Sequence, residues 1–336
     1  PQMDAECRDI ILAAIEKYST VFEGSSATLP KPFDAPPIEL NFKPDATPQS
    51  IPEPRWPHAY GKVVQKWAED GLANGSLEPS TSSWASRAHI VLKAPAGIIA
   101  SLANIADCKL RVTGDYRMVN SQIAKLVPNL PTGSHQLERA SGHRFYFESD
   151  SVACYNSFRL AAGRSREALA IWTPGGLVQP TVLPFGQKNS GTEAQGPHRV
   201  ASRALKNISN YVDDWLGFSN DMLELCHDFV AFLKVCFDNF ITLNTNKTRV
   251  GYESANFFGF TVSKLGTRLA EKHLDPIRTL VPPSDIGGLR RVLGLFVVSR
   301  RYIENYAVIT KPLTDLLRAA IRHLNGDRHS KPPLKT

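Results

Sequence analysis

Residues 210–219 read Asn-Tyr-Val-Asp-Asp-Trp-Leu-Gly-Phe-Ser and place two adjacent carboxylates, Asp213 and Asp214, inside a short apolar run. Neighbouring side chains on a strand point to opposite faces of a sheet, so one carboxylate would enter a core unless the pair lies at a tight turn. A hairpin tip would present both to a divalent cation such as Mg²⁺, which prefers oxygen ligands and binds phosphates. An acidic surface turn is the alternative interpretation.

A second acidic strand end precedes this stretch. Residues 145–151 read Phe-Tyr-Phe-Glu-Ser-Asp-Ser, which predicts a strand carrying Asp150 near its end, and Tyr155 follows five residues later. If this strand lies beside the 210–219 hairpin, three carboxylates converge, which is what two metal ions at one site require. A single aspartate at a strand end otherwise serves as a helix N-cap.

Composition limits the class of protein. A chain of 336 residues suggests two or three domains or one large mixed domain, and 42% hydrophobic with 21% charged residues favours a globular fold over disorder. The sequence has no apolar run of about 18 residues and no secretory signal pattern, so we expect neither a membrane span nor secretion. The five cysteines are scattered, which argues against a disulfide framework and a structural zinc site.

Positive charge is concentrated at the C-terminal end. From Lys264 onward there are 14 Lys and Arg against 6 Asp and Glu, a net charge of +8, whereas the whole chain carries +7. Such asymmetry is typical of a face that binds a polyanion, and a nucleic-acid duplex would supply the phosphates. A solvated basic helix pair is the alternative.

Periodicity predicts the N-terminal elements. Apolar residues at helical spacing over 7–22 and 58–70 predict two amphipathic helices, and the first stripe comprises Ile11, Ile15, Tyr18 and Phe22. The proline-dense segment 29–57 between them predicts an extended arm. Strands are expected at 89–93 and 109–114, separated by a small-residue stretch at 94–106.

Strands and helices are predicted to alternate over residues 170–318. Residues 170–173 and 177–183 predict a strand pair around a Pro-Gly-Gly turn, and Ala201, Leu205 and Ile208 predict a helix. Residues 219–240 predict the strongest helix, with Asp221 and Glu224 in a capping-box arrangement. A hairpin is expected from strands at 257–263 and 267–270, followed by helices over 286–298 and 302–318.

Two arginines flank a polar hexapeptide. Residues 115–120 read Asp-Tyr-Arg-Met-Val-Asn and follow the strand that carries Arg111. Arg111 and Arg117 are permanently charged and suit a triphosphate or a nearby carboxylate. For Arg117 we favour a salt bridge with Asp115.

Taken in order, these segments resemble the polymerase region of a reverse transcriptase of the gypsy-like LTR retrotransposons. The resemblance is collinear from about residue 10 to about residue 320. The matching segments are 79–86, 115–120, Asp150, Pro184-Phe185-Gly186 with Asn189, Tyr211 to Asp214 (the family's Tyr-x-Asp-Asp), Leu243-Asn244 with Lys247, Phe258-Gly259, and 289–317.

The resemblance implies an α+β right-hand polymerase with fingers, palm and thumb, whose palm is an antiparallel sheet backed by helices. The implied boundaries are an N-terminal helix and arm at 1–57, fingers at 58–124 and 160–184, palm at 125–159 and 185–270, and the start of the thumb or connection at 271–336. The implied function is an RNA-directed DNA polymerase, a magnesium-dependent nucleotidyltransferase. Its location would be intracellular, in a cytoplasmic particle or the nucleus.

The resemblance also implies residue roles. Asp150 and Asp213 would bind two Mg²⁺ ions, with Mn²⁺ as an alternative, while Asp214 would assist and Lys247 would protonate the leaving group. Arg111, Phe185 and Gly186 would contact the deoxynucleoside triphosphate, and Tyr155 would exclude a 2′-hydroxyl. Phe258 and Gly259 would form the primer grip on an RNA or DNA template with its primer, and the basic C-terminal helices would hold the duplex backbone.

Three departures from the family pattern support a second hypothesis. Gly196-Pro197 is expected to break a helix, residues 206–210 are polar where the family has an apolar strand, and residues 94–106 replace a basic fingers loop. These changes make activity uncertain around residues 191–210. The alternative is a catalytically impaired, retroelement-derived protein that serves as a structural or nucleic-acid-binding subunit of a larger assembly.

Overall fold

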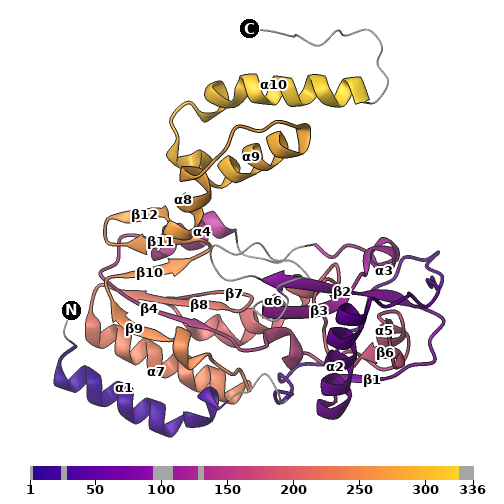
Figure 1. The fold of residues 1–336 in the computed structure, drawn as a ribbon. Helices are drawn as coiled ribbons and strands as arrows, with labels where there is room; N and C mark the ends of the chain where they lie inside the picture. The colour runs from indigo at the N-terminus through magenta and orange to yellow at the C-terminus, as the bar shows by residue number, and fades with distance from the viewer. Residues whose placement is uncertain (1–2, 24–28, 94–108, 128–131, 325–336) are drawn as a thin grey trace. The chain divides into compact units, whose positions relative to one another are not determined.

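The computed structural model describes residues 3–23, 29–93, 109–127 and 132–324, and Figure 1 shows their secondary structure. The chain divides into two compact units. One comprises residues 1–257 with 262–266, and the other comprises residues 258–261 with 267–336. Both α-helices and β-sheets are present, so the predicted α+β class is confirmed. Segment 94–106, which we expected to replace a fingers loop, lies outside the described residues.

The N-terminal segment packs as a helix followed by an extended arm. Helix α1 (Ala5–Lys17) begins with the Asp4 carboxylate accepting a 2.8 Å hydrogen bond from the backbone N–H of Cys7, and a 3₁₀ turn η1 (Ser19–Phe22) follows. Ile15 is 37% exposed, so the predicted stripe was wrong at that position. The described residues 29–57 contain no helix or strand but form isolated bridges to the body, which confirms the arm.

A five-stranded sheet forms one part of the first unit. Its order is β1-β6-β5-β2-β3, and all neighbours are antiparallel except β2 and β5. Helix α2 (His58–Asn74) contacts β1 and β5. The strands are β1 (Leu77–Pro79), β2 (Ser86–Lys93), β3 (Lys109–Gly114), β5 (Ile171–Thr173) and β6 (Gly176–Pro180). The first unit also contains the short helices α3 (Arg117–Gln122), α4 (Gly133–Ala140), η3 (Cys154–Ser157) and α5 (Arg164–Glu167).

A four-stranded antiparallel sheet in the order β7-β8-β4-β9 forms the other part. Its strands are β4 (Phe145–Asp150), β7 (Ile208–Tyr211), β8 (Asp214–Ser219) and β9 (Arg249–Tyr252). Helix α7 (Met222–Asp238) covers one face, and α1 lies on the outer side of α7 (Figure 1). The fully buried ring of Phe147 lies 5.2 Å from that of Phe229 and 5.3 Å from that of Phe232. This aromatic core fixes the sheet that carries the acidic residues.

Helix α6 (Ser190–Ala201) contradicts two expectations. It continues through Gly196 and Pro197, although Pro197 removes one backbone donor. The helix persists because Ala194, Gln195 and His198 are buried on the face that packs inward. The predicted helix through Ile208 was also wrong, because a short η4 turn (Ser202–Ala204) follows α6 and Ile208 begins β7.

Residues 254–324 contain short strands and three α-helices. Strands β10 (Ser254–Phe257), β11 (Phe260–Ser263) and β12 (Gly266–Leu269) form a small sheet. The predicted single strand over 257–263 is interrupted because Phe258 and Gly259 have φ of 54° and 78°. Helices α8 (Glu271–Arg278), α9 (Ile286–Ser299) and α10 (Tyr306–Leu324) follow, with a 3₁₀ turn η6 (Arg300–Tyr302) before α10. Among the described residues, no helix is both long and apolar enough to cross a bilayer.

Candidate active site

The sheet register brings the acidic residues together. Asp150 at the end of β4 is the direct cross-strand partner of Asp214 at the start of β8, and Asp213 lies in the turn between β7 and β8. The backbone N–H of Ser151 donates a 2.8 Å hydrogen bond to the carbonyl of Asp213. The two segments that carry the predicted aspartates are therefore joined through their backbones.

The electrostatics couple Asp213 to its neighbours. Partial burial of its carboxylate and the nearby charge of Asp150 raise the pKa of Asp213, although the turn leaves much of the residue exposed. The cations of Lys247 and Arg111 act in the opposite direction. Lys247 Nζ lies 2.8 Å from Asp150 Oδ1, and 19% of the Asp150 side chain is exposed. This site thus combines two close carboxylates with a lysine in direct contact.

The donor set fits a divalent cation at Asp150 and Asp213. Carboxylate oxygens are the ligands that Mg²⁺ prefers. The negative charge of Asp150 contributes to the raised pKa of Asp213, so a cation beside the two carboxylates would be stabilised. Within the described residues, no group of three or more His, Cys, Asp or Glu side chains is arranged to hold a metal ion. The role of Asp214 as a third ligand therefore stays a prediction.

Arg111, Phe185 and Gly186, three of the residues predicted to contact the nucleotide, line a cavity of about 570 Å³, whereas Tyr155 is not part of its lining. The guanidinium of Arg111 lies 4.2 Å from the centre of the Phe185 ring, and Tyr155 packs edge-on against the same ring at 4.9 Å. Burial raises the pKa of Tyr155 to about 12, so its hydroxyl is neutral. Arg117 forms the expected salt bridge with Asp115 at 2.6 Å. The cavity lining includes His89, Arg111, Thr113, Asp115, Phe185 and Gly186.

A buried polar cluster supports the aspartate turn, and sequence reasoning did not find it. Gln195 Oε1 accepts a 2.6 Å hydrogen bond from the backbone N–H of Val212, while its amide nitrogen donates to Asn210 at 2.8 Å. His198 Nδ1 lies 2.9 Å from the Val212 carbonyl. The interpretation of residues 206–210 as missing buried support was wrong, because Ser209 and Asn210 are buried and Asn210 belongs to this cluster.

The predicted primer-grip residues lie at the β10–β11 turn in the second unit. Phe258 and Gly259 both adopt positive φ, and a Cβ at Gly259 would come 2.5 Å from His273 Nε2. Glycine is therefore required at this turn. The contact of these residues with a primer stays a prediction.

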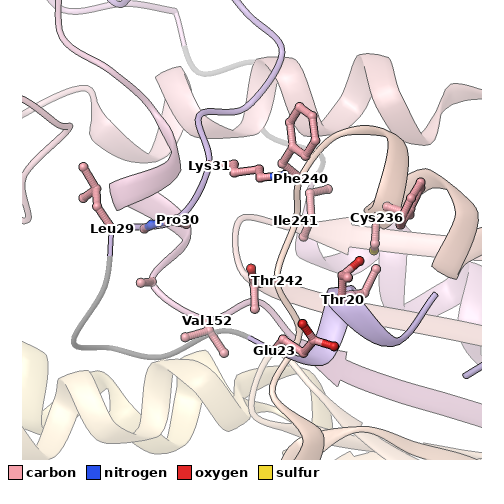
Figure 2. A pocket seen from close by; sticks show the side chains of 13 residues that line it. Thr20, Glu23, Leu29, Pro30, Lys31, Val152, Cys236, Phe240, Ile241 and Thr242 are labelled. Carbon is pink, nitrogen blue, oxygen red and sulfur yellow. The ribbon is translucent and has the colours of Figure 1, made fainter. Parts of the chain in front are cut away.

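A further cavity of about 480 Å³ contains none of the predicted site residues. Figure 2 shows its lining, where Lys31 lies beside Phe240 with Nζ 5.3 Å from the ring centre. Val152 and Ala153, two and three residues after Asp150, form part of its wall. Its other walls come from η1, the end of α7 and the start of the arm.

The chain is similar in sequence to known proteins. Residues 106–262 match the family described as reverse transcriptase (RNA-dependent DNA polymerase). The chain is 25% identical over 276 residues to the retrovirus-related Pol polyprotein from transposon gypsy of Drosophila melanogaster, covering 79% of this chain and 25% of that protein. It is 29% identical over 224 residues to the enzymatic polyprotein of figwort mosaic virus, covering 65% and 33% respectively. The chain thus spans about a quarter to a third of these relatives.

Solved structures share the fold. The foamy viral protease-reverse transcriptase dRH in complex with double-stranded DNA superimposes with a TM-score of 0.80 at 19% identity, over 94% of this chain and 53% of that chain. The foamy viral protease-reverse transcriptase in complex with an RNA/DNA hybrid gives a TM-score of 0.79 at 19% identity, over 94% and 41%. Similarity at this identity shows the fold, and it confirms the predicted polymerase fold.

Proposed function

We propose that the chain is an RNA-directed DNA polymerase, because residues 106–262 match the reverse transcriptase family and the chain is similar to the Pol polyprotein of the gypsy retrotransposon. The observation that carries the proposal is the β4–β8 register, which brings Asp150 beside the Asp213–Asp214 turn. The reaction would add deoxynucleotides to the 3′ end of a primer on an RNA or DNA template.

Asp150 and Asp213 would hold the divalent cations. When bound, two Mg²⁺ ions, or Mn²⁺ in their place, would activate the primer 3′-hydroxyl and stabilise the pyrophosphate that leaves. Lys247 lies 2.8 Å from Asp150, so its ammonium group is already at the edge of this centre. From there it would donate a proton to the departing pyrophosphate, with Asp214 assisting at the neighbouring strand position.

Arg111, Phe185 and Tyr155 would select the nucleotide. The Phe185 ring holds the Arg111 guanidinium on its face and makes a T-shaped contact with the Tyr155 ring, so both side chains are fixed before a nucleotide enters. Arg111 would then neutralise triphosphate oxygens, and Gly186 leaves room for close approach of the substrate. The Tyr155 ring would occupy the space that a ribose 2′-hydroxyl needs.

The impaired-subunit alternative is left with little support. One of its supports was a helix break at Gly196-Pro197, but α6 is continuous there. Another was a polar segment at 206–210, which instead contributes Asn210 to the cluster beneath the turn. The active polymerase is therefore the interpretation that the geometry favours.

Primer extension tests the proposal. We expect incorporation of dTTP on poly(rA)–oligo(dT) with Mg²⁺, and we expect Asp213→Asn to abolish it, because the variant lacks one of the two coupled carboxylates. Circular dichroism and duplex binding of both proteins serve as controls. If folded parent protein bound the duplex in a salt-dependent way but incorporated nothing, the polymerase proposal would fail and the subunit alternative would stand.

A further inference from the structure

Two buried aromatic side chains lie beneath the aspartate turn. The rings of His198, on α6, and Trp215, on β8, have centroids 5.6 Å apart, and the two residues are only 2% and 1% exposed. Trp215 also packs against Phe232 of α7 at 5.1 Å. Both rings are therefore held in place by the core of the first unit.

Each ring bonds one of the two segments that carry the aspartates. His198 Nδ1 lies 2.9 Å from the carbonyl of Val212, the residue before Asp213, and Trp215 Nε1 donates a 3.0 Å hydrogen bond to Ser151 Oγ, directly after Asp150. Because a carbonyl can only accept, Nδ1 of His198 carries a proton and donates it to Val212. Burial lowers the pKa of His198 to about 4, so the ring is neutral at pH 7. The packed rings of His198 and Trp215 therefore link the segment that carries Asp213 to the segment that carries Asp150.

Val212 has an unfavourable backbone conformation that these contacts stabilise. Its φ is 55°, in the left-handed region that a β-branched residue strongly disfavours. Such a conformation persists only where the surroundings fix it. Here α6 fixes both polar groups of Val212, since Gln195 accepts from the N–H and His198 donates to the carbonyl. The direction of the Asp213 carboxylate follows from this constrained backbone.

We propose that His198 and Trp215 are positioning residues that set the separation of Asp150 and Asp213 for cation binding. The expected effect on catalysis rests on the proposed function. The expected effect on cation affinity does not depend on it. His198 acts through the Val212 carbonyl, and Trp215 acts through the Ser151 hydroxyl. Neither side chain touches substrate.

Four variants separate hydrogen bonding from packing. His198→Leu removes the donor, whereas His198→Asn keeps an amide donor near the position of Nδ1. Trp215→Phe removes the indole N–H but keeps an aromatic ring, and Ser151→Ala removes the same bond from its other end with little change in volume. Tyr146→Phe is the matched control. Tyr146 lies on the same strand as Asp150 but away from the turn, and the substitution deletes a buried 2.9 Å hydrogen bond from its hydroxyl to the Ala140 carbonyl.

Two readouts are measured on each protein. The first is kcat and KM for dTTP in primer extension, and the second is Mn²⁺ affinity from the electron paramagnetic resonance of free Mn²⁺, without nucleic acid. We expect His198→Leu and Trp215→Phe to lower kcat about tenfold or more, the size of effect that a small misplacement of reacting groups produces, with KM for dTTP within about twofold. Both should weaken Mn²⁺ binding severalfold, while His198→Asn and Tyr146→Phe stay near the parent.

The outcomes are distinguishable. If the parent protein does not polymerise, the proposed function fails, and the Mn²⁺ affinities alone decide the positioning proposal. If His198→Leu does not fold, His198→Phe, which keeps a ring but has no N–H donor, takes its place as the test of the Val212 bond. Trp215→Phe, Ser151→Ala and their double variant test the Trp215–Ser151 bond in either case. Variants whose kcat and Mn²⁺ affinity match those of Tyr146→Phe would overturn the proposal.

Discussion

Tyr155 is fixed by its neighbours before any nucleotide arrives. Its ring packs edge-on against Phe185, at an angle of 83°, and its hydroxyl would lie 3.8 Å from a Cβ built at Gly191. The ring thus lies between Phe185 and α6, which limit its movement. Under the proposed function, selection between deoxynucleotides and ribonucleotides would depend on the space that this ring fills.

We therefore expect Tyr155→Val to lower the preference for deoxynucleotides. Removing the ring opens space for the 2′-hydroxyl, and a packing difference of this size typically changes selectivity by about 10- to 200-fold. The measurement is the ratio of kcat/KM for dTTP and UTP on poly(rA)–oligo(dT). Tyr155→Phe keeps the ring, so its ratio is expected to stay within about twofold of that of the parent. An equal ratio for Tyr155→Val and the parent would contradict a steric role for the ring.

His198 makes stability depend on pH. Burial lowers the pKa of His198 from 6.5 to about 4, so the unfolded chain takes up this proton at a higher pH than the folded protein. Stability is therefore full above pH of about 6.5 and falls as the pH drops toward 4, by up to about 3 kcal/mol from this group.

The expected result is a shallower pH dependence in His198→Leu than in the parent between pH 6.5 and 4. Urea unfolding followed by circular dichroism at several pH values measures it. The difference between the two curves isolates His198 from the carboxyl groups that titrate in the same range. Parallel curves would show that the imidazole is not buried as described.

At the scale of elements, α6 shows how a helix tolerates poor helix formers. Its interior contains Gly196 and Pro197, yet its inward face carries three side chains that pack or bond beneath the active-site turn. Tertiary contacts outweigh local propensity here.

Gly196→Ala is therefore expected to stabilise the protein. A Cβ at this position meets nothing within 4 Å, so the substitution gains about 0.5–1 kcal/mol of helix propensity without a clash. Thermal unfolding measures the change. Gly217→Ala is the opposite control, because its Cβ would overlap the Phe147 ring across the β4–β8 pair. A destabilised Gly196→Ala would mean that α6 needs glycine for a reason other than space.

Sequence reasoning succeeded where pattern and motif agreed. The strand ending at Asp150, the helix after Asp221 and the turn at Asp213 each combine a clear period with a characteristic residue. It failed at Gly196-Pro197 and at Ser209-Asn210, because local rules penalise these residues and only the folded chain reveals their partners. The sequence alone gave no signal for Gln195, because its two hydrogen-bond partners, Val212 and Asn210, lie 15 or more residues further along the chain.

At the scale of the whole molecule, the basic C-terminal unit is expected to supply much of the nucleic-acid affinity. Arg291 on α9 and Arg300 on η6 are both exposed. Arg291→Gln with Arg300→Gln should weaken duplex binding and reduce the slope of log K against log salt by about 0.9 for each phosphate that is no longer neutralised. Fluorescence anisotropy at several salt concentrations measures this slope.

Lys66→Gln provides the comparison, since Lys66 is exposed in the first unit and pairs with Asp70 at 3.1 Å. We expect its salt slope to match that of the parent. A double variant in the second unit with an unchanged slope would show that the positive charge of this unit serves something other than a duplex.

The position of β4 inside its sheet has a consequence for synthesis of the chain. Strand β4 pairs with β8 and β9, which are made some 70 to 100 residues later. Until then Phe145, Tyr146 and Phe147 form an apolar strand with two free edges, which is prone to pair with other chains. Nascent or truncated chains that end before Tyr252 should therefore aggregate, and chaperone binding during translation should be strongest between the emergence of β4 and that of β9.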